Sequence, residues 1–72
     1  MLVREIRDRC YTDWKRHQES RDAYMAQIAN GALRHIVNGE DVTDAITEEK
    51  AKACRIFRAR FEYFDKLAAA AD

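Results

Sequence analysis

The stretch Ile36-Val37-Asn38-Gly39-Glu40-Asp41 contains the one clear turn of this 72-residue chain. Asn-Gly after two apolar residues predicts the C-terminal end of a helix, because glycine adopts the left-handed cap conformation without steric cost. Beyond the turn, Thr43 or Asp44 can begin a second helix, and Thr47 is a stronger start because acidic residues follow it. The turn therefore divides the chain into two helical segments.

Long apolar patterns with helical spacing lie on both sides of this turn. The chain contains no proline, and proline is the usual interruption of a helix. We expect an all-α antiparallel helical hairpin, a single domain over residues 1–72, with a helical region at 3–37, a turn at 38–43 and a second helical region at 44–70. The residues with helical spacing are Val3, Ile6, Cys10, Trp14, Tyr24, Ile28, Ala32 and Ile36 before the turn, and Ile46, Ala53, Phe57, Phe61, Phe64 and Ala68 after it.

The first helical region is the less regular of the two. A continuous helix over residues 3–37 would be about 50 Å long. Two places could interrupt it: the polar segment 17–22, where Ser20 or Asp22 could begin a new helix, and Asn30-Gly31, which could form a left-handed cap. We favour a break or bend within 17–22. The alternative fold is a three-helix bundle, made by folding back the first ~20 residues.

The position of the turn sets the register of the hairpin. A turn centred near Glu40 places Phe57 opposite Tyr24, so that apolar side chains meet. It also places Arg60 opposite Arg21, and two guanidinium groups facing one another in a low-dielectric seam would be strongly unfavourable. Either the register changes there or both arginines reach carboxylates. The other expected pairs are Ile46 with Ile36 and Leu33, Ala53 with Ile28, Phe64 with His17 and Trp14, and Ala68 with Trp14.

The apolar arc of the second helix is wider than one neighbouring helix can cover. It spans about 180°, against about 100° for a surface helix, and large exposed apolar patches usually mark interaction sites. A lone core of this size also rarely supplies more than ~3–5 kcal/mol. We therefore expect a multi-copy protein that packs against itself or a larger protein complex. The predicted partner interface comprises Trp14, Tyr24, Ile56, Phe57, Arg60, Phe61, Tyr63, Phe64 and Leu67, with Arg21, Arg55 and Arg58 as candidate contacts to acidic groups of a partner.

The charge pattern argues against nucleic acid as the partner. Thirteen basic residues balance thirteen acidic ones, whereas non-specific binding to nucleic acid depends on net positive charge. Lys52, Arg55 and Arg58 share one face of the second helix, but Glu48 and Glu62 interleave with them. A solvated, salt-bridged face is favoured over a DNA-binding regulator. The alternative function is a small helical inhibitor or adaptor that binds one enzyme or nucleic-acid machine through these arginines and the neighbouring acids.

No constellation of residues indicates catalysis, a metal site or a cofactor. Ser20 lies near His17, but an orienting carboxylate and an oxyanion loop are both missing. No apolar run approaches the ~18 residues of a membrane span, and no secretory signal is evident. We expect a non-enzymatic protein that needs no cofactor, binds no membrane and is cytoplasmic when made. The potential metal ligands, none of which has the spacing of a known site, are Cys10, His17, His35 and Cys54.

The stretch Ala32-Leu33-Arg34-His35-Ile36-Val37-Asn38-Gly39-Glu40-Asp41-Val42-Thr43, followed by a helix with Ala53, Ile56 and Phe57, resembles short helical-hairpin proteins encoded among the virion structural genes of tailed bacteriophages. The likeness covers residues 22–67. One feature departs from it, because the glycine expected in the second helix is replaced by alanine. The resemblance implies a small structural component of the capsid or head–tail junction, present in many copies in the virion, and it implies no catalytic residue.

Overall fold

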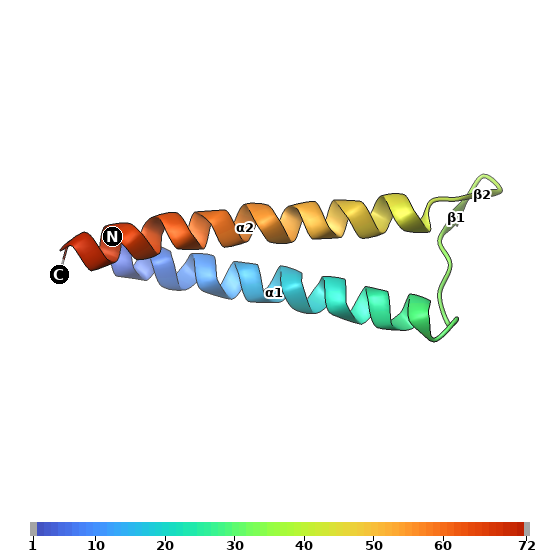
Figure 1. Cartoon of the computed structure of the whole chain (residues 1–72), viewed down its shortest axis with the longest axis horizontal. Coiled ribbons are helices and arrows are strands. Elements are labelled where there is room, and N and C mark those ends of the chain that lie inside the picture. Colours follow the sequence, from blue (N-terminus) through green and yellow to red (C-terminus); the bar gives the residue numbers. More distant parts are fainter. Residues whose placement is uncertain (1, 72) are drawn as a thin grey trace.

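The computed structural model of the protein describes residues 2–71 and consists of two long helices joined by a short β-hairpin (Figure 1). Helix α1 is Val3–Ala29 and helix α2 is Thr43–Ala71, while strands β1 (Ile36–Val37) and β2 (Glu40–Asp41) lie in the connection. The helices run antiparallel, and the molecule measures 53 × 20 × 16 Å. The predicted all-α antiparallel hairpin is confirmed. Residues 2–71 do not form the alternative three-helix bundle.

Helix α1 is continuous through the polar segment 17–22, so the break favoured there is wrong. Without proline or glycine in this segment, every residue can keep its helical hydrogen bond. The helix ends instead at the second candidate, Asn30-Gly31. Gly31 has a φ of +70°, its N–H donates to the Ile28 carbonyl oxygen at 3.0 Å, and the Ala32 N–H donates to that of Gln27 at 3.0 Å. These two bonds form a Schellman motif, which requires a residue that tolerates positive φ.

Asn38-Gly39 forms the turn of a β-hairpin and not the end of a helix, which corrects the prediction. Strands β1 and β2 pair antiparallel, with Ile36 opposite Asp41 and Val37 opposite Glu40. Asn38 and Gly39 have φ values of +53° and +80°, and two consecutive positive φ angles are typical of a two-residue type I′ turn. The first helix therefore ends at Ala29 rather than at residue 37. The connection between the helices is residues 30–42, longer than the predicted turn at 38–43.

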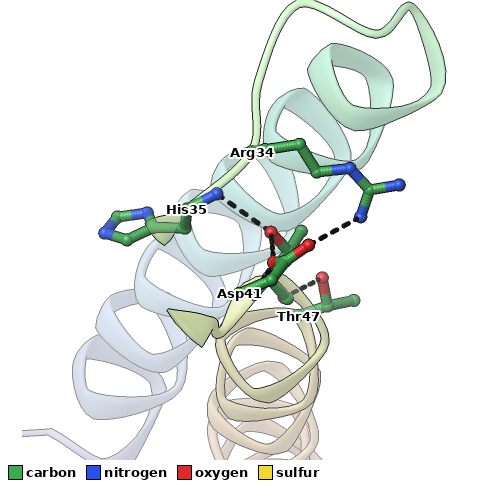
Figure 2. Close-up of polar contacts among 5 residues, drawn as sticks. Arg34, His35, Asp41 and Thr47 are labelled. Atoms are coloured by element: carbon green, nitrogen blue, oxygen red, sulfur yellow. Dashed lines mark hydrogen bonds and ion pairs between the residues drawn. The ribbon is translucent and has the colours of Figure 1, made fainter. Parts of the chain in front are cut away.

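A cluster of polar contacts fixes the start of α2 (Figure 2). The Asp41 carboxylate accepts hydrogen bonds from the Thr43 N–H at 2.9 Å and from the Thr43 hydroxyl at 2.5 Å. The same hydroxyl oxygen accepts a bond from the His35 N–H at 2.9 Å, and the Arg34 guanidinium lies 3.8 Å from the Asp41 carboxylate. The helix thus begins at Thr43, one of the two earlier candidates, and the preference for a start at Thr47 is wrong. The Thr47 hydroxyl lies one turn inside the helix and donates to the Thr43 carbonyl oxygen.

The two helices meet along a seam of aromatic side chains. Trp14 stacks on Phe61 with ring centroids 5.6 Å apart, and His17 stacks on Phe57 at 4.3 Å with an interplanar angle of 12°. Phe57 was expected opposite Tyr24, so the predicted register is wrong by about two helical turns. The other pairs predicted in that register are displaced with it. The cause is the early end of α1, which moves the point of reversal toward the N-terminus.

The predicted encounter between two arginines does not occur in this register. Arg60 extends along its own helix, and its guanidinium lies 5.0 Å from the Phe57 ring centroid. Arg21 forms an ion pair with Asp22 at 3.2 Å. The first expected route is realised because the register changes. The second is realised only for Arg21, since Arg60 lies on an aromatic ring and not on a carboxylate.

Few side chains of this hairpin are removed from water. Among the described residues, the apolar buried side chains are those of Tyr24, Cys54 and Ala68, and Thr43 is buried at the start of α2. The chain exposes 5498 Å², whereas a compact monomer of its mass would expose about 4600 Å². Its radius of gyration is 16.0 Å, against about 11 Å for a compact domain of this length. The hairpin is elongated and lacks a closed core.

Gly39→Ala should lower the free energy of unfolding by about 1–2 kcal/mol, because the φ of +80° is costly for any residue with a Cβ. Asn38→Gly is the matched control, since glycine adopts the φ of +53° at that position without this cost. Urea denaturation followed by circular dichroism measures both values. Equal stability of Gly39→Ala and the wild-type chain would contradict the assigned turn.

Acid should weaken the start of α2 through Asp41. The hydrogen bonds from Thr43 hold the pKa of Asp41 below its usual value of 3.8, and Arg34 contributes in the same direction. Folding therefore favours the ionised Asp41 carboxylate. The stability that this carboxylate contributes is complete above pH ~4 and is lost as the pH falls through the lowered pKa. Urea midpoints measured between about pH 6 and pH 2 should fall less steeply in Asp41→Asn. Thr43→Val removes the hydroxyl donor and should reduce the same slope, and unchanged slopes in both variants would refute this account.

Candidate functional site

A second line of residues with helical spacing runs along α2 beside the seam. We call it the outer stripe, and its positions alternate at spacings of three and four, as coiled-coil contacts do. Each of its residues directly precedes a residue of the seam side, so the outer stripe lies about 100° around the helix from the seam. A second helix can pack at that angle without displacing α1. The outer stripe comprises Ile46, Glu49, Ala53, Ile56, Arg60, Tyr63 and Leu67.

The C-terminal part of the outer stripe is open to solvent and, apart from Arg60, apolar. Ile56 is 44% exposed, Tyr63 is 60% exposed and Leu67 is 40% exposed. The Tyr63 ring is held edge-on against Phe64, with centroids 5.1 Å apart. Because α1 covers the neighbouring side of α2, these three residues form an unpartnered apolar line. Such a line is typical of a protein interaction surface.

The structure divides the predicted interface residues into two groups. Trp14, Phe57, Phe61 and Phe64 are half-buried, and the first three contact aromatic rings of the opposite helix. Tyr24 is only 9% exposed, and the Lys50 ammonium lies 5.2 Å from its ring centroid. Trp14, Tyr24, Phe57 and Phe61 thus join the two helices, and Phe64 lies half-buried on the same side of α2. Ile56, Arg60, Tyr63 and Leu67 make up the other group, and they lie together on the outer stripe.

The arginines predicted to meet acidic groups of a partner form ion pairs within the chain. Arg55 contacts Glu48 at 3.2 Å and Arg58 contacts Glu62 at 3.0 Å. All four side chains are exposed, and exposed pairs of this kind contribute about 0–1 kcal/mol. Arg21 is likewise paired with its neighbour in sequence, as described above. These arginines are therefore already paired with carboxylates of their own chain. Acidic groups of another protein could replace those carboxylates at small cost in free energy, because the pairs are exposed.

Sequence reasoning did not single out Glu49, which is a member of the outer stripe. Its carboxylate is exposed on the outer stripe, seven residues before Ile56 and eleven before Arg60. The alternating spacing of three and four continues back from Ile56 through Ala53 to this position, and that periodicity could have revealed it. The missed position adds a negative charge to a stripe whose other charged member is Arg60.

Other kinds of site are weakly represented in residues 2–71. No group of three or more His, Cys, Asp or Glu side chains in that range could hold a metal ion. Cys54 is buried and Cys10 is half-buried, and both are free thiols. An open cleft of about 260 Å³ lies between the ends of the two helices, lined by Leu2, Val3, Arg4, Ala68 and Ala71. Within the described part of the chain, neither helix has an apolar segment long enough to cross a membrane.

Comparisons with models of protein families, with curated proteins and with solved structures find no match to this chain. The outer stripe is therefore identified from its own geometry and chemistry.

The two groups of aromatic residues should respond differently to substitution. Phe61→Ala should lower the free energy of unfolding by about 2 kcal/mol, less than for a fully buried phenylalanine because Phe61 is half-buried. Tyr63→Ala removes an exposed ring and should change it by less than about 0.5 kcal/mol. Both values are measured by urea denaturation at a concentration where the chain is monomeric. Equal losses in the two variants would show that Tyr63 belongs to the core of the hairpin.

Proposed function

We propose that this chain is a small non-enzymatic structural or assembly protein that packs through the outer stripe against copies of itself or against a larger protein complex. The observation that carries the proposal is the exposure of Ile56, Tyr63 and Leu67 on one line of α2. At about 25 cal/mol per Å², covering side chains of this size stabilises an association by several kcal/mol before its entropic cost. The elongated hairpin gains stability from any partner that covers this line.

The resemblance of residues 32–43 and the following helix to small tailed-phage proteins supports a more specific form of this proposal. In that form the chain is a virion component at the capsid or the head–tail junction. A long, narrow hairpin with one apolar stripe can serve as a repeated subunit, because identical copies can use the same stripe around a ring or shell. Quantitative mass spectrometry of purified particles should then detect the chain in many copies per particle. Absence of the chain from such particles would exclude the virion role.

A second candidate function rests on the other side of α2. The exposed Arg55–Glu48 and Arg58–Glu62 pairs offer charges to a partner with a matching pattern, as expected for a small inhibitor or adaptor of one enzyme or nucleic-acid machine. Such a protein would form one-to-one complexes that weaken with salt, because exposed charges are screened. Packing through the outer stripe is governed by apolar contact and should depend less on salt.

Light scattering after size-exclusion chromatography tests the proposed packing. The wild-type chain should show a mass above 8.4 kDa that rises over a hundredfold range of concentration, as mass action requires. Tyr63→Asp and Leu67→Asp place a charge in the apolar line and should return the chain to the monomer mass. Met25→Asp is the matched control, since Met25 is a 47% exposed apolar residue on α1. A wild-type monomer throughout this range would favour the adaptor function.

A further inference from the structure

We propose that the occupant of the outer stripe is a second copy of this chain, whose α2 packs antiparallel to the first with Glu49 of each copy against Arg60 of the other. This inference rests on the proposed function and specifies its partner and register. The contact is isologous, so each residue pair across it occurs twice. With α1 of each copy on the outside, the product is a four-helix arrangement.

The spacing of the outer stripe selects this register. Positions that alternate at spacings of three and four correspond to positions a and d of a heptad repeat. In an antiparallel helix pair, each a position of one helix faces a d position of the other, and each such pair forms a layer. The register proposed here brings Ile46 against Tyr63 and Ala53 against Ile56, so that every apolar position meets another. Sliding the partner helix by seven residues, so that it moves toward the C-terminus of the first α2, would place Arg60 against Ile56. A charge would then lie in an apolar layer. That alternative is disfavoured because a charge buried without a partner is costly.

Charge complementarity supports the same arrangement. Glu49 and Arg60 are the two charged members of the outer stripe, both are exposed, and within residues 2–71 neither belongs to an ion pair of its own chain. The proposed register is the one in which these opposite charges face each other. Arg60 already lies along the Phe57 ring, which extends its guanidinium beside the helix surface. Two such pairs flank the central contacts between Ala53 and Ile56.

The surface available matches what a dimer needs. The chain exposes about 900 Å² more than a compact monomer of its mass, and a stable interface covers about 800 Å² on each partner. The contact would extend from Leu67, beside Val42 of the other copy, to the same pair at the opposite end. Residues 43–67 of α2, about 36 Å of helix, would lie in this contact. The outer stripe therefore has both the length and the apolar content for a second copy.

Charge reversal tests the register directly. Sedimentation equilibrium of the full chain measures the dimer Kd for the wild type, Glu49→Arg, Arg60→Glu and the double variant. Each single variant brings like charges together twice and should raise the Kd about tenfold or more. The double variant restores opposite charges and should return the Kd to within about threefold of the wild type. Lys66→Glu is the matched control, because it reverses an exposed charge of α2 outside the outer stripe.

Disulfide trapping gives a second readout that does not depend on charge. In a chain with Cys10→Ser and Cys54→Ala, the pair Glu49→Cys with Arg60→Cys should give a covalent dimer on mild oxidation, because the two positions lie opposite one another across the contact. The pair Lys52→Cys with Arg60→Cys leaves the apolar line intact and is offset by about one turn, so it should react at least about tenfold more slowly. Equal trapping of both pairs, or failure of the double charge variant to restore the Kd, would overturn this register.

The outcomes separate this inference from the function on which it rests. If the wild-type chain associates and Tyr63→Asp abolishes association, but the charge and disulfide results fail, then the outer stripe is an interface of a different arrangement and only the register is refuted. If the wild-type chain stays monomeric, or if Tyr63→Asp has no effect on its association, then both the inference and the proposed self-packing fail.

Discussion

A single pair of helices can cover only one side of each, and this constraint governs the structure of the protein. The covered side holds the stacked rings of Trp14 on Phe61 and of His17 on Phe57. Its closed apolar part is small, since Cys54 and Ala68 are short side chains. Tyr24 is buried with its hydroxyl unpaired in the described structure, and a buried polar atom without a hydrogen bond costs free energy. The hairpin is thus held by a narrow seam with little stability to spare.

The sequence predicted the class of fold well and the path of the connection poorly. The spacing of apolar residues identified both helices, and the end points of α2 differ by one residue from the prediction. The connection was misread because an Asn-Gly pair serves two structures, a helix cap with one positive φ and a type I′ hairpin turn with two. Gly31 had already supplied the helix cap, and the β-branched pair Ile36-Val37 favours a strand. The predicted register was counted from this turn. Because the turn was assigned to the end of the first helix, the predicted contacts between the helices were displaced with it.

The candidate site was visible in the sequence only as part of a wider arc. Phe57, Phe61 and Phe64 obey the same spacing as Ile56, Tyr63 and Leu67, and nothing in the spacing alone says which line faces α1. The structure assigns Phe57 and Phe61 to the seam, where they stack on His17 and Trp14. On the other line, Tyr63 packs edge-on against Phe64 of its own helix, and no stacking with α1 is found for that line within residues 2–71. What sequence reasoning treated as one aromatic interface is therefore two surfaces, one facing α1 and the other open to solvent.

The one-residue offset between the seam and the outer stripe ties the function of α2 to its residue count. Deleting or inserting one residue near the start of α2 would rotate all that follows by about 100°. An insertion would turn the line Ile56, Tyr63 and Leu67 toward α1 and carry the phenylalanines about 100° beyond the seam. A deletion would instead bring the phenylalanines to the outer side of the helix. A change of seven residues would restore the facing of both lines to within about 20°. Related chains should therefore vary freely on the polar side of this helix. Their helix length should differ only by whole heptads.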